Sequence, residues 1–387
     1  MSVLTTDVEQ AVRDRYSRSA RAPEAALCCA PSYDRRYLDV LPRELIEKDY
    51  GCGDPTEFVS AGQTVLDLGS GAGKACYILS QKVGREGRVI GVDMNDDMLA
   101  LAERHRDEIG RRIGWHNVEF RKGRIQNLRL DLRRVDAWLR EHPVRDAAGL
   151  ADLDAFCRKI ERESPLVESD TIDVIVSNCV LNLVRPDDKT ALFAEMYRVL
   201  RNGGRAAISD IVCDEDVPPN LQNDPELWSG CISGAFREDL FLRAFADAGF
   251  HAIEIVRWND QPWRTVEGIE FRSVTVSAFK GKSGPCFEHM QGVMYLGPWS
   301  AVHDDDGHRY PRGVRVAVCD KTFRLLKNGP YASRMAFFEP RTPIVSSEAK
   351  PFDCARTSPR HPRETKGQAY DATTTESSCC GTDTGCC

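Results

Sequence analysis

The chain has 387 residues, with 52 basic and 59 acidic side chains, a net charge of −7 and 42% apolar residues. This length and composition suit one large core or two to three smaller ones, and they exclude a disordered or fibrous protein. The negative net charge argues against nucleic acid as a main partner, because neutralising the phosphates of a nucleic acid needs a basic protein surface. The most apolar stretch, Thr171–Val184, is interrupted by polar residues such as Asp173 and Asn178, so we expect no membrane-spanning segment.

The cysteine content is unusual for the cell compartment that the sequence indicates. The N-terminal residues lack a basic flank followed by an apolar run, so we expect no secretion signal and a cytoplasmic protein. Fifteen cysteines are present all the same. Thiols are kept reduced in the cytosol, where a disulfide framework is not expected. We therefore expect the cysteines to have a chemical role.

Strands alternate with helices from Gln63 onward, whereas residues 1–60 do not resemble a complete domain. The expected strands cover residues 64–68, 88–94, 117–123, 171–178 and 205–211, and the expected helices cover 74–82, 95–111, 187–200 and 237–248. This alternation predicts βαβ units, a parallel doubly wound sheet and right-handed crossovers. Two further strands, 251–258 and 272–280, complete the sheet, and the last of them is expected to be antiparallel.

Changes in composition and in the pattern of expected strands and helices divide the chain into the expected domains. They are an N-terminal segment (1–60), a nucleotide-binding domain (61–212) with a helical insertion at about 128–169, a region completing the sheet (213–283), a small C-terminal α+β domain (284–340) and a tail (341–387). The tail is rich in Ser, Thr, Pro and charge with almost no aromatic residues, so we expect it to be disordered.

A glycine-rich turn, GSGAG at 69–73, follows the first strand of the sheet and precedes a helix. Glycine permits close approach of a ligand to backbone N–H groups at a helix N-terminus. Asp93 ends the next strand, 20 residues after Gly73 (93 − 73), a spacing that suits a carboxylate accepting hydrogen bonds from ribose hydroxyls. A tight turn without a ligand is the simpler interpretation of the glycines alone. The position of Asp93 at the end of the next strand favours nucleotide-type binding.

Three cysteines lie on segments that are able to face one cleft. Cys52 sits between glycines before the first strand of the sheet, Cys179 ends the fourth strand, and Cys231 lies in a Gly/Ser-flanked segment after the fifth. These neighbours make a packed apolar site unexpected for the three. The remaining cysteines of the folded region are interpreted as small buried apolar residues, namely Cys76, Cys157, Cys213, Cys286 and Cys319. No CxxC pair or matching histidine spacing indicates zinc.

The first of two resemblances concerns the cofactor. VLDLGSGAG, GVDM and RNGGRAAISD resemble the motifs of class I, Rossmann-like S-adenosylmethionine (SAM) methyltransferases. The GxGxG loop disfavours NAD, the competing interpretation. Carried over from this resemblance, Gly69 and Gly71 approach the amino-acid part of the cofactor, Asp93 holds the ribose, and Met94 and Ile125 flank the adenine.

The second resemblance is more specific and concerns the substrate. YGCG, SNCV and the W..C..GA segment, together with the cofactor motifs, resemble the arsenite SAM methyltransferases over about Asp49 to Lys282. That family has four functional cysteines, which match Cys28 or Cys29, Cys52, Cys179 and Cys231. The resemblance also implies that Tyr50 contacts the cofactor, and Asn178 is a candidate to line the donor site.

The implied reaction transfers methyl groups from SAM to arsenite or methylarsenite held by thiolates of Cys52, Cys179 and Cys231. The thiolates fix the arsenic lone pair toward the donor methyl, and no general base is required. Cys28 or Cys29 with Cys52 is expected to form a disulfide that supplies two electrons, re-reduced by thioredoxin or glutathione.

Two alternatives remain open at the level of sequence. One is a methyltransferase of another soft or small substrate, such as methylarsenicals only, selenium species or a thiol. The other is a metalloid-binding protein without turnover, which the cofactor motif disfavours. The vicinal cysteines of the tail are also candidate metalloid ligands, namely Cys379, Cys380, Cys386 and Cys387.

Overall fold

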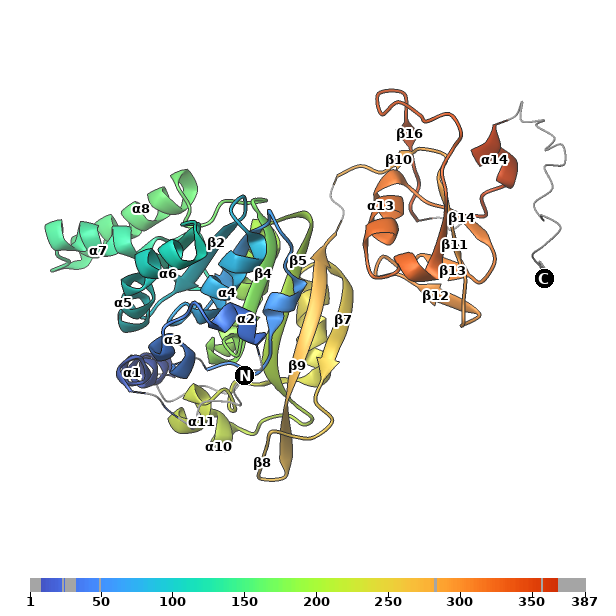
Figure 1. Cartoon of the computed structure of the whole chain (residues 1–387). Coiled ribbons are helices and arrows are strands. Elements are labelled where there is room, and N and C mark those ends of the chain that lie inside the picture. The colour runs from blue at the N-terminus through green and yellow to red at the C-terminus, as the bar shows by residue number, and fades with distance from the viewer. Residues whose placement is uncertain are drawn as a thin grey trace. The chain divides into compact units, whose positions relative to one another are not determined.

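The structure is a computed structural model that describes residues 8–22, 24, 33–48, 50–281, 284–355 and 358–367 (Figure 1). It divides into two compact units, Met1–Gly281 and Lys282–Cys387. Among the described residues, none of the helices combines the length and apolar composition that a membrane span requires.

The first unit is built on one mixed sheet, with the strand order β3-β2-β1-β4-β5-β9-β7. Its strands are β1 (Thr64–Leu68), β2 (Arg88–Asp93), β3 (Val118–Lys122), β4 (Ile172–Asn178), β5 (Leu200–Cys213), β6 (Phe236–Arg237), β7 (Phe250–Trp258), β8 (Arg264–Val266) and β9 (Ile269–Lys280). β1 to β5 pair in parallel, and β9 runs antiparallel between β5 and β7. The predicted doubly wound sheet with an antiparallel last strand is confirmed.

Helices flank this sheet, as the cartoon in Figure 1 shows. They are α1 (Val8–Arg21), α2 (Arg35–Leu38), α3 (Arg43–Glu47), α4 (Lys74–Val83), α5 (Asp96–Arg104), α6 (Arg106–Ile113), α7 (Leu132–Glu141), α8 (Ala147–Glu163), α9 (Lys189–Val199), α10 (Pro219–Gln222), α11 (Pro225–Ser229) and α12 (Glu238–Asp247), with short 3-10 turns η1 (Pro55–Phe58), η2 (Leu181–Leu183) and η3 (Pro186–Asp188). The helix expected over 95–111 is divided at His105 into α5 and α6. The insertion forms two helices, α7 and α8.

Two apolar clusters lie on the two faces of the sheet, because successive side chains of a strand point to opposite faces. Leu66 and Leu68 of β1 belong to the cluster that includes α9 and α12, whereas Val65 belongs to the cluster that includes α4 and α5. A third, smaller cluster joins the segment before β1 to residues that follow β4 and β5, and it contains Cys52, Cys179 and Cys231.

The second unit holds three small antiparallel sheets and a helix around its own apolar cluster. Its elements are β10 (Phe287–Glu288), β11 (Gly292–Tyr295), β12 (Ala301–His303), β13 (Arg309–Pro311), β14 (Arg315–Ala317), α13 (Asp320–Asn328), η4 (Ala332–Arg334), β15 (Met335–Phe338), β16 (Lys350–Pro351) and α14 (Pro362–Lys366). The strand order of the largest sheet is β14-β11-β15.

Part of the tail that we expected to be disordered is ordered. β16 and α14 lie beyond residue 341, and Arg360 is only 5% exposed. Its guanidinium pairs with Glu288 at 2.7 Å and Glu364 at 2.7 Å, and its backbone N–H donates to Arg315 O at 2.8 Å. The prediction was wrong for this stretch because a low apolar content does not reveal a buried, fully paired arginine. Residues 368–387 lie outside those described.

Candidate functional site

A cleft lies at the carboxyl ends of β1, β2 and β4, the edge where open α/β sheets bind ligands. All the predicted cofactor residues line it, namely Tyr50, Gly69, Gly71, Asp93, Met94, Ile125 and Asn178. Helix α1 forms a further wall through Glu9, Val12, Arg13 and Tyr16. The topology therefore brings the predicted residues into one site.

The glycine loop has the backbone conformation that only glycine adopts easily. Gly69, Gly71 and Gly73 have φ values of 71°, 51° and 83°. A Cβ on Gly69 would lie 2.4 Å from Val180 Cγ1, whereas a Cβ on Gly71 would meet no atom within 4 Å. The loop thus packs tightly under Val180 and leaves open space at Gly71, which a ligand is able to approach.

Asp93 ties this loop to the end of β2. Its carboxylate accepts a hydrogen bond from Gly71 N at 2.8 Å and another from Asn95 N at 2.8 Å. Burial raises the pKa of Asp93, and the backbone hydrogen bonds act in the opposite direction. Asp93 also lines the cleft, as hydrogen bonding to ribose hydroxyls would require.

Asn178 fixes the loop that carries Cys52, a role that the sequence did not reveal. Its Oδ1 accepts hydrogen bonds from Cys52 N at 2.8 Å and Gly53 N at 3.2 Å, and its Nδ2 donates to Gly53 O at 2.6 Å. A Cβ on Gly51 would come within 2.3 Å of Asn178 Nδ2. The glycine that precedes Cys52 therefore permits this close approach, and Asn178 acts as a positioning residue besides lining the cleft.

The three cysteines that we expected to share a cleft lie together. Cys52 and Cys179 form a disulfide, with their Cα atoms 6.0 Å apart. The Cys231 thiol donates a hydrogen bond to Cys179 O at 3.2 Å. Cys179 also lines the cofactor cleft, so the sulfur cluster adjoins it. Three residues separated by 127 and 52 positions (179 − 52 and 231 − 179) thus meet at one edge of the sheet.

The environment of these cysteines differs from our expectation. Glycine and serine neighbours suggested that they avoid a packed apolar site, but Cys52, Cys179 and Cys231 are 8%, 1% and 0% exposed within an apolar cluster. The prediction was wrong because small neighbours allow tight packing as readily as they allow exposure. Burial away from water disfavours a free, charged thiolate. It is compatible with a neutral thiol, or with a thiolate that is bound to a soft ion.

Two of the three cysteines have a backbone conformation that is rare for residues with a side chain. Cys179 has φ 56° and Cys231 has φ 62°. Such left-handed residues cost about 1–3 kcal/mol each and cluster at functional sites. Cys179 N donates to Ser209 O at 2.8 Å and Cys231 N donates to Trp228 O at 3.0 Å, which hold the two conformations in place.

A buried carboxylate supports the turn after Cys179. Asp210 accepts hydrogen bonds from Leu181 N at 2.9 Å and from Asn182 Nδ2 at 2.8 Å. Burial raises the pKa of Asp210 to about 6, although these hydrogen bonds and the nearby Lys189 lower it. Burial also disfavours the charged form of Lys189, and for this cation it lowers the pKa to about 8. Neither residue was singled out from the sequence, since only the fold places Lys189 near Asp210.

Arg15 anchors helix α1 beside the Cys231 segment. Its guanidinium, 7% exposed, pairs with Glu24 at 2.7 Å and donates to Ser229 Oγ at 3.0 Å, two residues before Cys231. Tyr50 Oη donates to Ser19 O of the same helix at 3.2 Å. The sequence carried no signal that helix α1 forms a wall of the site.

The remaining predicted cysteines fall outside the described residues. These are Cys28, Cys29, Cys379, Cys380, Cys386 and Cys387. The predicted pairing of Cys52 with Cys28 or Cys29 is therefore not tested, and within the described part of the chain Cys52 is bonded to Cys179.

Comparisons with known proteins cover most of the chain. A family model described as a methyltransferase domain matches residues 59–164 and 157–249, and a domain of unknown function (DUF8838) matches residues 282–370. The arsenite methyltransferase of Aquipseudomonas alcaligenes is 32% identical over 332 residues, which are 81% of this chain and 85% of that protein. The human arsenite methyltransferase is 30% identical over 315 residues, 78% and 74% of the two chains.

One solved structure aligns over a similar extent. The crystal structure of an arsenic(III) SAM methyltransferase from Chlamydomonas reinhardtii matches with 26% identity and a TM-score of 0.53. The match covers 86% of this chain and 100% of the other. The similarity therefore extends beyond the SAM-binding fold that many methyltransferases share.

Proposed function

The chain belongs to the arsenite methyltransferase family, and we propose that Cys52, Cys179 and Cys231 are the residues that bind the arsenic during methyl transfer. As a member of this family it transfers methyl groups from SAM to trivalent arsenic. One observation carries the proposal: the three cysteines share one buried cluster, and Cys179 belongs both to this cluster and to the wall of the cofactor cleft.

The cleft fits SAM in its shape and its polar groups. Gly71 leaves open space beside the loop, and Asp93 lies on the wall of the same cleft, where ribose hydroxyls are proposed to donate hydrogen bonds to its carboxylate. When bound, SAM supplies a methyl group on a positively charged sulfonium. Gly69 and Gly71 are expected to approach its amino-acid part, while Met94 and Ile125 flank its adenine. The contacts of Tyr50 and Asn178 with the cofactor are part of the same proposal.

The cysteine cluster is suited to orient its substrate. Trivalent arsenic bound by three thiolates is pyramidal, with a lone pair on its open side, and thiolates are the soft ligands that such an ion prefers. Left-handed backbone at Cys179 and Cys231 fixes two sulfur positions, so the rate gain comes mainly from proximity and orientation. Burial in an apolar cluster keeps water from the reacting atoms.

The disulfide has to be opened before arsenic binds. Cys52 and Cys179 are bonded to each other, which removes two of the three proposed ligands. Thioredoxin or glutathione is the proposed reductant, acting by thiol–disulfide exchange. Such chemistry suits a cytoplasmic location, where thiols are kept reduced.

The same sulfur atoms are also able to supply electrons after methyl transfer. Arsenic is then formally pentavalent, and two electrons return it to the trivalent state when two thiolates close to a disulfide. The predicted pair is Cys28 or Cys29 with Cys52. The bond between Cys52 and Cys179 offers a second pair that has the required proximity. In both cases one thioredoxin dithiol, or two molecules of glutathione, is oxidised to a disulfide as the protein disulfide is reduced to two thiols.

The proposal is tested by methylation assays with arsenite, SAM and a thiol reductant. We expect Cys52→Ser and Cys179→Ser each to lower the yield of methylated arsenicals at least about 1000-fold, because the substrate is no longer oriented. Cys157→Ser, a half-buried cysteine on α8, is the matched control and retains activity. Full activity of Cys179→Ser would overturn the proposal.

A second set of variants tests the electron donors. Loss of turnover beyond the first methyl transfer in the Cys28→Ser/Cys29→Ser double variant supports the predicted pair. Multiple turnovers at the normal rate in that variant would assign the redox step to Cys52 and Cys179 instead.

A further inference from the structure

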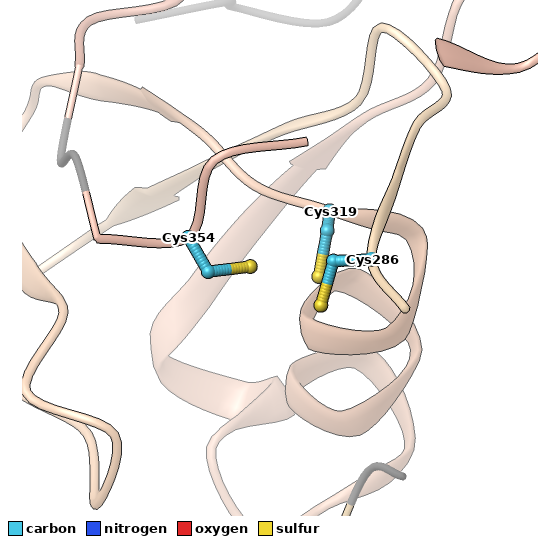
Figure 2. Close-up of side chains that lie close together, drawn as sticks. All are labelled: Cys286, Cys319 and Cys354. Atoms are coloured by element: carbon cyan, nitrogen blue, oxygen red, sulfur yellow. The ribbon is translucent and has the colours of Figure 1, made fainter. Parts of the chain in front are cut away.

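The second unit contains a cysteine cluster that the reaction described above does not use. The Sγ atoms of Cys286, Cys319 and Cys354 all lie within 4.8 Å of one another. Figure 2 shows the sulfur atoms of Cys286 and Cys319 side by side, with that of Cys354 pointing toward them. We had interpreted Cys286 and Cys319 as ordinary buried residues and had placed Cys354 in a disordered tail, so the cluster is a finding of the structure.

Backbone pairing brings two of the three residues together across more than sixty positions. Cys286 precedes β10 and Cys354 follows β16, and these two strands pair antiparallel, with Phe287 opposite Pro351. Phe352 N donates to Cys286 O at 2.8 Å. The imidazole Nε2 of His308 lies 3.0 Å from Cys354 O, and this contact holds the backbone at Cys354 in place. The chain is thus organised to hold these two thiols at one point.

Cys319 lies at the N-terminus of helix α13, a position that favours a thiolate. It is the N-cap of the helix, and its sulfur accepts a hydrogen bond from Thr322 N at 3.4 Å. Although burial acts in the opposite direction, the hydrogen bonds from Thr322 lower the pKa of Cys319. Burial and the neighbouring sulfurs raise the pKa of Cys354.

We propose that Cys286, Cys319 and Cys354 form a second arsenic site, which binds one trivalent arsenic through three sulfur atoms and does not take part in methyl transfer. Thiolates select soft ions. Any three atoms at most 4.8 Å apart have a common point within about 2.8 Å of each, so a small adjustment reaches bonding distances near the ~2.3 Å of metal–thiolate bonds.

The number of ligands and the charge favour arsenic over zinc. Among the described residues no His, Asp or Glu joins the three cysteines as a fourth ligand, whereas structural zinc sites are almost always four-coordinate. Trivalent arsenic with three thiolates is electrically neutral, but divalent zinc with three thiolates carries one negative charge, which is costly at a site where Cys319 is 0% exposed. The choice of arsenic also rests on the family's substrate.

Binding at this site is a ligand exchange without electron transfer. Arsenous acid, As(OH)3, exchanges its three hydroxyl groups for three sulfur atoms, and each thiol proton leaves with one hydroxide as water. Three As–O bonds and three S–H bonds break, while three As–S bonds and three molecules of water form. The oxidation state of arsenic stays at three, so the site needs no reductant beyond the one that keeps the thiols free.

The site is tested by counting arsenic atoms on the full-length chain. Four substitutions to serine at Cys379, Cys380, Cys386 and Cys387 first remove the tail as a source of ligands. In this parent, Cys286→Ser/Cys319→Ser/Cys354→Ser is expected to retain one arsenic atom fewer per chain after arsenite treatment and gel filtration, measured by elemental mass spectrometry. Cys157→Ser is the matched control and retains the parent's arsenic. Equal arsenic in parent and triple variant would overturn the proposal.

A second measurement keeps the test valid where the triple variant does not fold. In the tail-substituted chain that also carries Cys179→Ser, the X-ray absorption spectrum of bound arsenic is expected to show three sulfur neighbours, and one of them is lost in Cys286→Ser. Fewer than three sulfur neighbours before that change would overturn the proposal. So would zinc that is retained at these thiols in the presence of excess arsenite.

The test is independent of the proposed catalytic ligands. The triple variant is expected to methylate arsenite within about twofold of its parent, since it keeps the proposed ligands Cys52, Cys179 and Cys231 that orient the substrate. Failure of the catalytic proposal appears as activity in Cys179→Ser, and failure of the second site appears as unchanged arsenic content. The two outcomes are read from different variants.

Discussion

The two units gather cysteines in different ways. In the first unit, Cys179 follows β4 in the left-handed conformation at the edge of a cofactor cleft, and Cys231 has the same conformation in a segment after β5. In the second unit, Cys319 caps a helix while Cys286 and Cys354 flank a two-residue strand pair. Three cysteines therefore come together beside parallel strands of the large sheet in the first unit, and beside short antiparallel strands and a helix N-terminus in the second.

This contrast separates binding from chemistry. Both clusters offer thiols to a soft ion, and the first shares Cys179 with the cleft that holds Asp93 and the glycine loop. Methyl transfer needs donor and acceptor in one orientation, and a thiol cluster alone does not supply it. Substitutions in each cluster test whether the two clusters differ in this respect.

The largest expected difference lies in catalysis. Cys231→Ser is expected to lower methylarsenical production at least about 1000-fold with SAM affinity within about threefold, because a substrate ligand is lost and the cofactor cleft is intact. Cys286→Ser is expected to change the rate less than about twofold. The measurements are methylation rates and calorimetric SAM binding. Comparable losses of rate in the two variants would remove the distinction between the clusters.

The two units are also expected to respond oppositely to pH. The folded pKa of Asp210, about 6, exceeds its ordinary 3.8, so its neutral form stabilises the first unit below pH ~4, and this contribution of about 3 kcal/mol is lost as the pH rises through 6. In the second unit, although burial acts in the opposite direction, hydrogen bonds from His308 and Tyr310 lower the pKa of Asp304. Its contribution is present above pH ~4 and is lost as the pH falls further.

Urea unfolding between pH 3 and 7 measures this difference. Asp210→Asn is expected to flatten the pH dependence of the first unit and to leave that of the second unchanged. An unchanged slope between pH 4 and 6 in Asp210→Asn would show that Asp210 is ionised throughout this range.

The cofactor carboxylate gives a smaller effect that is confined to one unit. Asp93→Asn removes a charged acceptor, which lowers SAM affinity by about 10- to 100-fold, since a hydrogen bond to a charged group contributes about 1.5–3 kcal/mol. Arsenic binding to the chain is expected to stay unchanged. SAM titration and arsenic counting check the two statements, and Asp96→Asn at the exposed start of α5 is the matched control. Normal SAM affinity in Asp93→Asn would exclude Asp93 as the ribose ligand.

Features encoded locally or by topology were predictable from the sequence. The glycine loop follows β1, Asp93 ends β2 and Cys179 follows β4, and these three strands are neighbours in the sheet. The carboxyl ends of parallel strands meet at one edge, so the convergence of these residues follows from the strand order. The antiparallel last strand was likewise expected from the pattern of residues 251–258 and 272–280. These predictions needed no knowledge of side-chain contacts.

Features that depend on long-range packing were not predictable. The burial of Cys52, Cys179 and Cys231 results from apolar residues of β5 and β9, far away in the sequence. The second cluster depends on the pairing of β10 with β16, two strands of two residues each. Pieces this short carry no periodicity to detect, and the charged composition around β16 suggested disorder.

The smallest expected effect concerns Asn178, which distinguishes a positioning residue from a cofactor ligand. Asn178→Ala removes the hydrogen bonds that fix Cys52 and Gly53 against β4, so Cys52 moves relative to Cys179. We expect about a tenfold lower single-turnover methylation rate with SAM affinity within about threefold, since a neutral hydrogen bond contributes about 0.5–1.5 kcal/mol. Asn220→Ala, an exposed residue bonded to Glu267, is the control and changes neither value. The opposite split, weaker SAM binding with a normal rate at saturation, would instead identify Asn178 as a cofactor ligand alone, because a residue that only orients Cys52 contributes nothing to cofactor affinity.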